Sequence, residues 1–233
     1  MNEEIAILMA AGLGTRMRPL TEHIPKPLVK VKGIPLIETI IEGLTERKVK
    51  EIYVIVGYLK EQFNYLCKKY DNLKLIENTE YLEKNNISSL YAIGDILGSA
   101  NCFICEADLY VADKSIFKKV NDKSCYFAKM VYGYSNDWLF EVHNDLITKI
   151  QKGGKDKYNM VGISYWKKED AKLIKDAIHT LYAKEEYKNL FWDEVVDKEL
   201  NKISVGVMEI PYNSIWEIDT IEELDKINKI YDE

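Results

Sequence analysis

The sequence lacks the features that mark secreted and membrane-bound proteins. Its 233 residues include only 4 cysteines, which do not form the pattern of a disulfide framework. No apolar run approaches the ~18 residues that a membrane-spanning helix requires. The N-terminus, Met1-Asn2-Glu3-Glu4, is acidic where a secretory signal would be basic. We therefore expect a cytoplasmic protein that does not insert into a membrane.

An excess of basic residues is also missing. The chain has 32 Lys and Arg against 38 Asp and Glu, a formal net charge of −6, and its lysines are spread along the sequence. A nucleic-acid-binding surface needs clustered positive charge. We therefore expect a small molecule as partner, and the acidic balance is compatible with a pocket that binds a cation. The 3 histidines have no recognisable acid–base or metal-ligand spacing.

Strands and helices alternate in the first half of the chain. Apolar runs predict strands at 5–10, 51–57, 73–76 and 102–105, and helical spacing predicts helices between them, from Pro35, at 59–70 and at 89–97. This order predicts a mostly parallel sheet that binds its ligand at the carboxyl ends of the strands. Cys102 and Cys105 stand three apart in one strand, on opposite faces, so we expect buried thiols and no zinc site.

The second half of the chain is richer in strands. Segments 126–132, 140–143, 146–150 and 161–166 are strand-like, Asn144-Asp145 predicts a hairpin turn, and a long helix is expected from Lys168 to about Ala183. The chain shows no linker and no repeat. We expect one α/β domain over 1–233, a Rossmann-like three-layer fold with a mixed, mostly parallel sheet and a small β-rich lid extension.

A glycine turn follows the first strand. Ile5–Met9 leads into Ala10-Ala11-Gly12-Leu13-Gly14-Thr15-Arg16, and Lys26 follows in Pro25-Lys26-Pro27. Gly12 and Gly14 allow positive φ and let backbone N–H groups approach an anion. Arg16 adds a planar donor fork and Lys26 a point charge. This combination predicts a site for a triphosphate.

Two common phosphate loops do not match this turn. The Walker pattern requires Gly-Lys-Ser/Thr, and the dinucleotide pattern requires a third small residue where Met17 stands. The alternative is that the glycines only close a tight turn, which leaves Arg16 and Lys26 unexplained.

Two acidic segments stand at the ends of expected strands. Asp108 follows a buried strand, close to Glu106, and Asp219 follows Ile215-Trp216 more than a hundred residues later. Mg²⁺ prefers few protein carboxylates together with water and phosphate oxygens, so Asp108 and Asp219 predict a magnesium site. The alternative for Asp219 is the N-cap of a helix that starts near Thr220, and both roles can hold together.

These motifs resemble the sugar-phosphate nucleotidyltransferases, and within them the bacterial CTP:phosphocholine cytidylyltransferases. The likeness rests on the glycine turn with Pro25-Lys26-Pro27-Leu28-Val29, the two Asp residues, and stretches such as Asn136-Asp137-Trp138 and Ser214–Asp219. It implies a nucleotide-diphospho-sugar transferase-like fold and Mg²⁺-dependent transfer of CMP from CTP to phosphocholine. It also implies a nucleotide-binding half (1–110) and an acceptor-binding half (111–233), with Lys26 and Arg16 as catalytic residues. The implied nucleotide-binding residues are Ala10, Ala11, Gly12, Leu13, Gly14, Thr15, Arg16, Lys26, Ser89, Glu106 and Ala107.

The acceptor side is expected to hold a trimethylammonium group. Such a group cannot donate hydrogen bonds and is bound by aromatic faces and negative charge. Trp138, Trp192 and Trp216, 3 of the 4 tryptophans, lie near acidic residues and predict an acceptor site with Asp193 and Glu217. The alternative is that these rings only pack in the core or lid.

The chain departs from the family at three positions. Phe191 and Trp216 stand where tyrosine is expected, and an arginine expected beyond the strand after Asp108 is missing, which leaves Lys129 as a substitute for binding the acceptor phosphate.

Other activities remain open at this point. The acceptor can instead be 2-aminoethylphosphonate, phosphoethanolamine or a sugar phosphate, and the chain can be a catalytically silent nucleotide sensor. The resemblance also implies fusion to, or cooperation with, a choline kinase or a transferase.

Overall fold

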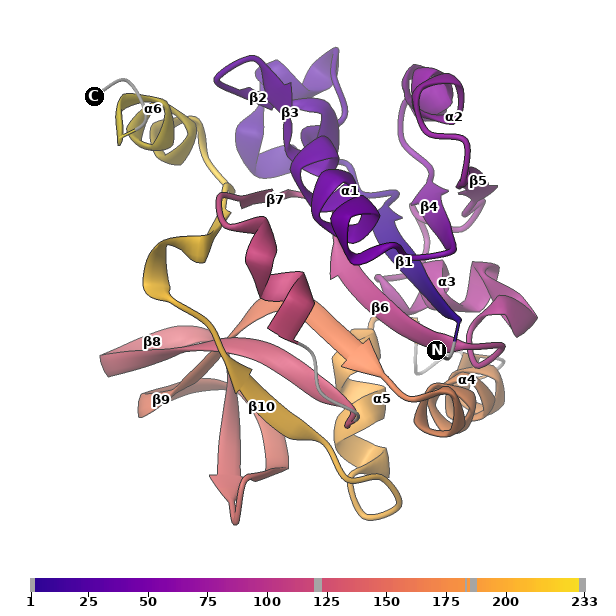
Figure 1. The fold of residues 1–233 in the computed structure, drawn as a ribbon, viewed down its shortest axis with the longest axis vertical. Helices are drawn as coiled ribbons and strands as arrows, with labels where there is room; N and C mark the ends of the chain where they lie inside the picture. Colours follow the sequence, from indigo (N-terminus) through magenta and orange to yellow (C-terminus); the bar gives the residue numbers. More distant parts are fainter. Residues whose placement is uncertain (1–2, 120–122, 183, 185–187, 231–233) are drawn as a thin grey trace.

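Seven strands form one mixed sheet that runs through both halves of the chain. The computed structural model describes residues 3–119, 123–182, 184 and 188–230 (Figure 1). In spatial order the strands are β10 (Gly206–Glu209), β8 (Cys125–His143), β9 (Leu146–Trp166), β6 (Asn101–Glu106), β1 (Glu4–Ala10), β4 (Glu51–Val56) and β5 (Leu73–Glu77). The last four are parallel to one another, and β9 is antiparallel to β6 and β8.

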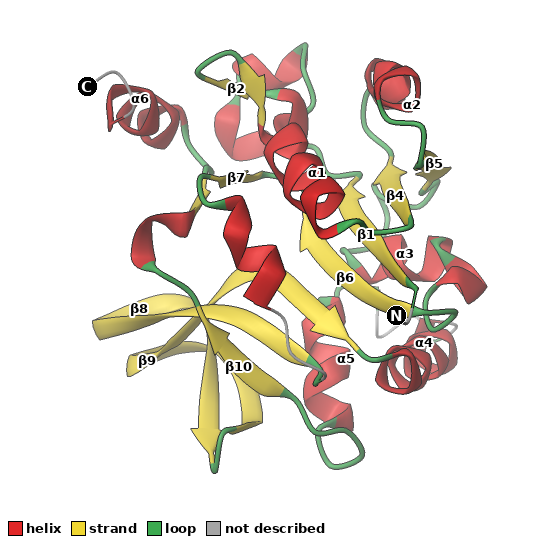
Figure 2. Ribbon diagram, in the orientation of Figure 1, coloured by secondary structure: helices red, strands yellow, loops and turns green. Residues whose placement is uncertain are grey.

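Helices cover both faces of this sheet (Figure 2). α1 (Leu36–Arg47) and α2 (Asn64–Lys69) pack on one face. α3 (Ile87–Ala92), α4 (Lys168–Tyr182) and α5 (Trp192–Glu199) pack on the other. The predicted three-layer α/β fold with a mixed sheet is confirmed.

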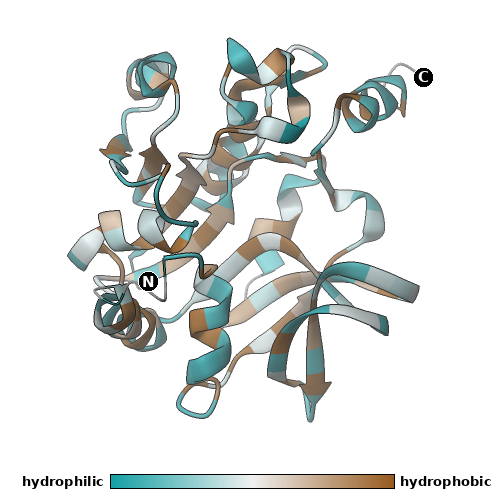
Figure 3. Cartoon of the chain, turned by 180° about the vertical axis from the view of Figure 1, so that it is seen from behind, coloured by the Kyte–Doolittle hydropathy of each residue, from teal (hydrophilic) through white to brown (hydrophobic). Residues whose placement is uncertain are grey.

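The core divides according to the alternation of side chains along each strand. In β1, Ala6 and Leu8 belong to the apolar cluster under α1, and Ile5 and Ile7 belong to the opposite cluster. Because both faces are buried, the strand is apolar throughout, and the central strands are mainly hydrophobic in Figure 3.

The two cysteines of the C-x-x-C pair are separated by the same alternation. Cys102 lies in the cluster under α3 and α4, and Cys105 lies in the cluster under α1. Both are free and buried, and burial raises the pKa of the Cys102 thiol to about 12. They are therefore unreactive core residues, as predicted.

Two predicted helices are interrupted. A 3-10 turn at Lys60–Phe63 precedes α2, and α3 gives way to a 3-10 turn at Gly94–Ile96 after Gly94 takes a φ of 58°. α4 ends at Tyr182, and the expected end at Ala183 lies outside the described residues. None of the helices in the described part of the chain has the length and apolar character needed to cross a bilayer.

The second half contains longer strands than predicted, which is a correction. The four expected segments belong to only two strands, β8 with 19 residues and β9 with 21. They join at Asn144 and Asp145, whose φ values of 49° and 62° suit a tight hairpin turn.

The register explains why the sequence pattern breaks within β8 and β9. The start of β8 pairs with the end of β9, and residues 139–143 pair with 146–151 near the turn. Between them, 134–138 pairs with 152–155 and forms an arm that is largely exposed. A strand pair with solvent around it has no apolar alternation, so the sequence pattern did not reveal it.

A two-stranded sheet brings the two acidic segments together. β7 (Leu109–Val111) pairs antiparallel with β11 (Ile215–Glu217), and Leu109 lies opposite Glu217. Asp108, just before β7, therefore lies near Asp219, just after β11. The remaining elements, β2 (Lys30–Val31), β3 (Ile34–Pro35) and α6 (Ile221–Ile230), lie around a small apolar cluster that includes Val31, Ile218 and Ile227.

The helix α6 begins with a capping box. Thr220 Oγ1 accepts the N–H of Glu223 at 3.2 Å, and Glu223 Oε2 accepts the N–H groups of Asp219 and Thr220 at 2.8 and 3.0 Å. The N-cap is therefore Thr220, and the cap role considered for Asp219 is wrong. The Asp219 carboxylate remains available for other partners.

Candidate active site

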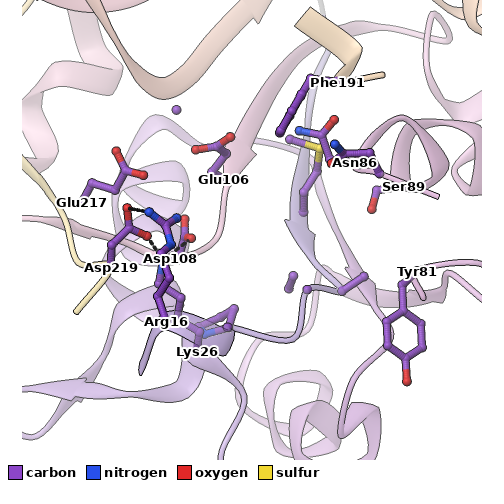
Figure 4. A pocket seen from close by; sticks show the side chains of 18 of the residues that line it. Arg16, Lys26, Tyr81, Asn86, Ser89, Glu106, Asp108, Phe191, Glu217 and Asp219 are labelled. Atoms are coloured by element: carbon purple, nitrogen blue, oxygen red, sulfur yellow. Dashed lines mark hydrogen bonds and ion pairs between the residues drawn. The ribbon is translucent and has the colours of Figure 1, made fainter. Parts of the chain in front are cut away.

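A cavity of about 550 Å³ opens at the carboxyl ends of β1 and β6 (Figure 4). The glycine turn lies on its wall, and residues within 78–89 together with residues of the second half of the chain close the other sides. Predicted site residues on the wall are Ala10, Ala11, Gly12, Gly14, Thr15, Arg16, Lys26, Ser89, Glu106, Asp108, Trp138, Glu217 and Asp219. The predicted residues Leu13, Ala107, Trp192, Asp193 and Trp216 do not line it.

The glycine turn needs its second glycine more than its first. Gly14 has a φ of 61°, and a Cβ built there would lie 2.9 Å from Lys26 Cβ and 3.2 Å from Thr21 Cγ2. Gly12 has no positive φ, which corrects the expectation for that residue, and a Cβ there would meet nothing within 4 Å. The missing Cβ of Gly14 therefore leaves room for the Lys26 side chain, whereas Gly12 leaves space in the cavity itself.

The backbone of the turn is held from outside the cavity. Thr21 Oγ1 donates to the Gly14 carbonyl at 2.8 Å, and the Tyr58 N–H donates to the Ala11 carbonyl at 3.2 Å. The N–H groups of Gly12 and Gly14 donate to no residue in the described part of the chain. A turn whose carbonyls are bound and whose amides are free is suited to an anion.

Lys26 joins the turn to both acidic segments. Its Nζ donates to Asp108 Oδ2 and to Asp219 Oδ1, each at 2.6 Å. Burial by itself would lower the pKa of Lys26, but the charges of Asp108 and Asp219 and their hydrogen bonds raise it above its ordinary value. The lysine is therefore a fixed positive charge at the floor of the cavity.

Arg16 approaches Asp219 from the solvent side. Arg16 Nη1 lies 2.7 Å from Asp219 Oδ2, and its side chain is 68% exposed. Burial would raise the pKa of Asp219, but Lys26 and Arg16 lower it below the usual value. Since an exposed ion pair adds little stability, Arg16 can exchange this carboxylate for a ligand phosphate at small cost.

The carboxylates of Asp108 and Asp219 fit a divalent cation. Both face the same lysine ammonium, and Asp108 Oδ1 is a buried oxygen that has no hydrogen-bond partner among the described residues. No group of three or more His, Cys, Asp or Glu side chains in the described ranges is placed to hold a metal ion. Two carboxylates completed by water and ligand oxygens are the arrangement that Mg²⁺ accepts.

Glu106 and Glu217 form an acidic region beside this centre (Figure 4). Burial, followed by the charges of Asp108 and neighbouring carboxylates, raises the pKa of Glu106 well above its usual value. Burial and the charges of Asp108 and Asp219 raise the pKa of Glu217 to about 8. Neither carboxylate has an ion pair with a lysine or arginine among the described residues. The raised pKa values favour the protonated forms of both side chains in the unliganded protein, and a bound cation would favour the ionised forms.

The opposite wall is polar and comes from the segment before α3 and from the first turn of α3. Asn78 Nδ2 donates to the hydroxyls of Ser88 and Ser89 at 2.8 and 3.2 Å, and Asn86 Oδ1 accepts the Trp192 N–H at 2.9 Å. Asn86, Ser89 and Phe191 lie together on this side in Figure 4. These contacts fix the wall on which Ser89 lies.

The predicted three-tryptophan acceptor site does not assemble, which is a correction. Trp192 is 3% exposed and stacks with Tyr126 at a centroid distance of 5.9 Å. Asp193 is buried next to it and accepts the Tyr126 hydroxyl at 3.0 Å. Trp216 packs edge-on against Tyr212 at 6.1 Å. Helical and strand geometry turns these side chains away from the cavity and into the packing.

Lys129 also lies elsewhere than predicted. Its ammonium donates to the Ile215 carbonyl and lies over the rings of Tyr212 and Trp216. Burial lowers the pKa of Lys129 to about 8. Lys129 does not line the cavity, so the structure does not place it for contact with an acceptor phosphate.

The aromatic wall that does form joins Trp138 to Phe191. Their ring centroids lie 5.5 Å apart at an interplanar angle of 69°. The ammonium of Lys152 lies 4.9 Å from the Trp138 centroid and 4.8 Å from that of Phe191. All three residues line the cavity.

Several wall residues were not among the predicted site residues. Phe191 was noted only as a departure from the family, and Lys152 belongs to the arm that the sequence pattern did not show. Asn85 and Asn86 give a signal that is visible in the sequence, because they stand as an adjacent pair just before the expected helix at 89–97. The additional wall residues include Asn78, Tyr81, Asn85, Asn86, Lys152, Met160, Gly162 and Phe191.

Comparison with known proteins gives consistent matches. Residues 5–131 match the nucleotidyl transferase family. The chain is 47% identical to a 2-aminoethylphosphonate cytidylyltransferase of Lancefieldella rimae, covering 94% of this chain and 89% of that protein. It is 39% identical to a choline-phosphate cytidylyltransferase of Streptococcus pneumoniae, covering 97% of each.

Solved structures show the same relationship. The CTP:phosphocholine cytidylyltransferase of Streptococcus pneumoniae superposes with a TM-score of 0.91 at 36% identity, covering 98% of this chain and 99% of that one. A glucose-1-phosphate thymidylyltransferase of Bacillus anthracis superposes with a TM-score of 0.80 at 16% identity, covering 97% of this chain and 94% of that one. The latter likeness concerns the fold alone.

The two glycines of the turn should respond differently to the same substitution. Gly14→Ala introduces strain at positive φ and a contact with Lys26, so we expect a lower melting temperature and weaker triphosphate binding. Gly12→Ala, the matched control, adds a methyl group only to the cavity, so it should weaken binding without lowering the melting temperature. Thermal melts and nucleotide titrations of both variants test this. Equal melting temperatures for both variants would contradict it.

The buried carboxyl group of Asp193 should make the stability of the protein depend on pH. Burial raises its pKa to about 7, above that of an unfolded aspartate, so its contribution to stability is lost as pH rises from about 4 through about 7. Asp193→Asn should remove this loss. The substitution should therefore raise the free energy of unfolding, relative to the wild type, more at pH 8 than at pH 4, by on the order of 2–4 kcal/mol. Denaturant unfolding of the wild type and the variant at pH 4 and pH 8 measures this difference. A gain in the free energy of unfolding that is the same at both pH values would contradict the prediction.

Proposed function

The chain belongs to the nucleotidyl transferase family and, within it, to the cytidylyltransferases, and from this membership we propose that it transfers CMP from CTP to a small aminoalkyl phosphonate or phosphate. The products are the CDP-linked or CMP-linked amine and pyrophosphate. The family sets the reaction class, and the charges of the cavity indicate the acceptor.

The observation that carries the acceptor class is the charge layout of one cavity. The glycine turn, Arg16 and Lys26 offer positive groups to phosphate oxygens. Glu106 and Glu217 form an acidic region that has no ion pair with a lysine or arginine among the described residues, and an ammonium bound there would favour their ionised forms. An acceptor that carries a phosphonate or phosphate at one end and an ammonium at the other complements both regions. A sugar phosphate, whose sugar part is uncharged, complements only the first.

The donor triphosphate is bound by the turn. The free amides of Gly12 and Gly14 can donate hydrogen bonds to phosphate oxygens. Arg16 exchanges its ion pair with Asp219 for contacts with the β- and γ-phosphates, which depart as pyrophosphate. Lys26 faces the α-phosphate, where negative charge builds in the transition state. Asp108 and Asp219 would hold Mg²⁺, which when bound supplies positive charge against the phosphate oxygens.

The acceptor reacts without a general base. Its phosphonate or phosphate oxygen is already an anion, so it attacks the α-phosphorus directly, one P–O bond forms, and the bond to the leaving pyrophosphate breaks. Such transfers depend on positioning and charge neutralisation more than on covalent help from the protein. The rigid seat of Lys26 on Gly14 provides that positioning.

A primary ammonium acceptor is the first candidate, represented by 2-aminoethylphosphonate. A primary ammonium donates three hydrogen bonds, and two carboxylates without a cation are its natural acceptors. A relative with 47% identity carries the name 2-aminoethylphosphonate cytidylyltransferase. Phosphoethanolamine offers the same ammonium and belongs to this class.

Phosphocholine is the second candidate, and a separate observation supports it. Trp138 and Phe191 present two neighbouring aromatic rings at the cavity wall, and aromatic faces are what bind a trimethylammonium group. The sequence match and the solved structure from Streptococcus pneumoniae, with 39% and 36% identity, are both named for phosphocholine. The loss of Trp192 and Trp216 from the cavity leaves this aromatic site smaller than the sequence predicted.

A pyrophosphate-release assay tests the proposal. Four nucleoside triphosphates are combined with 2-aminoethylphosphonate, phosphoethanolamine, phosphocholine and glucose 1-phosphate, with and without Mg²⁺. We expect turnover with CTP, dependence on Mg²⁺, and the highest kcat/KM for 2-aminoethylphosphonate. Nucleotide binding without pyrophosphate release under any combination would instead identify a silent nucleotide sensor.

Lys26→Ala should affect the chemical step more than donor binding. Removing a charge that stabilises the transition state is expected to lower kcat by about 10²–10³-fold, with a much smaller rise in the KM for CTP. Lys30→Ala, an exposed neighbour outside this cavity, is the control. Steady-state kinetics, with circular dichroism to verify folding, measure both, and an unchanged kcat for Lys26→Ala would remove Lys26 from the chemistry.

A further inference from the structure

The protein fills its own aromatic cation site. Lys152 lies directly opposite Trp138 in the β8–β9 arm, and its ammonium lies within 5 Å of the ring centroids of both Trp138 and Phe191. Lys152 has no ion pair with a carboxylate in the described part of the chain. The two rings are therefore the groups that hold this ammonium at the cavity wall.

A primary ammonium and a trimethylammonium group would be bound by different groups of this cavity. A primary ammonium can donate hydrogen bonds to Glu106 and Glu217 and does not require aromatic faces. A trimethylammonium group has no donors and depends on ring faces. Because two like charges cannot share one pair of rings, a trimethylammonium group at Trp138 and Phe191 has to displace Lys152.

We propose that Lys152 sets the acceptor preference of this cavity by occupying the aromatic site that a trimethylammonium group would need. The lysine thereby disfavours phosphocholine and leaves primary-amine acceptors unaffected. This inference rests on the proposed cytidylyl transfer for its kinetic consequence. Its physical basis, competition for two rings, is independent of turnover.

Lys152→Met is the informative substitution. Methionine keeps the unbranched shape and the apolar stem of lysine and removes the charge. The stem can therefore still pack against the rings, whereas the ammonium no longer occupies the cation site. Lys149→Met is the matched control, because Lys149 is exposed on the same strand and does not line the cavity.

The first measurement is binding without turnover. Tetramethylammonium is titrated against the full-length protein and its variants, with intrinsic tryptophan fluorescence as the signal. We expect Lys152→Met to bind it at least about fivefold more tightly than the wild type, as the gain of one cation–π site implies, and Lys149→Met to match the wild type. Adding Phe191→Leu to Lys152→Met should abolish the gain. Equal binding by wild type and Lys152→Met would overturn the proposal.

The second measurement is selectivity. The ratio of kcat/KM for phosphocholine to that for 2-aminoethylphosphonate should rise about tenfold in Lys152→Met and stay constant in Lys149→Met. An equal loss with both acceptors would overturn the proposal, because it would make Lys152 a ligand of the acceptor's phosphonate or phosphate group. If no acceptor supports pyrophosphate release, the proposed function fails, and the tetramethylammonium titration still decides the role of Lys152.

Discussion

The site depends on one buried ammonium. Lys26 Nζ bridges Asp108 and Asp219, which are 82 and 193 residues away in sequence, and Gly14 leaves the space in which its side chain lies. Without this charge, two half-buried carboxylates would face each other uncompensated. The pairing of β7 with β11 brings the carboxylates together, and the lysine makes that arrangement stable in the absence of ligand.

The same compensation explains why the site is poised for a triphosphate. Lys26 and Arg16 are bound to carboxylates that also suit a divalent cation, so the positive groups are positioned but not permanently occupied. Glu106 and Glu217 lie close to this centre and form no ion pair with a lysine or arginine in the part of the chain that the structure describes. One cavity thus presents basic groups on one side and acidic groups on another, and the proposal of a zwitterionic acceptor rests on this layout.

The acceptor side illustrates how tertiary packing selects among residues of one type. Of the tryptophans proposed for this role, only Trp138 reaches the cavity, and its partner is Phe191. Trp192 is the next residue after Phe191, yet it belongs to the core with Tyr126 because it begins the buried face of α5. Trp216 lies on β11 on the side away from its cavity-facing neighbour Glu217, as alternation along a strand requires.

The sequence by itself determined the features that depend on local chemistry. These were the apolar strands of the sheet, the glycine turn with Arg16 and Lys26, and the two aspartates at strand ends, since periodicity, glycine and charge act over a few residues. Tertiary structure alone decided which aromatic rings face the cavity and that the Lys152 ammonium lies over the rings of Trp138 and Phe191. Each of these outcomes depends on the register of distant strands and on competition for burial, and neither leaves a periodic mark in the chain.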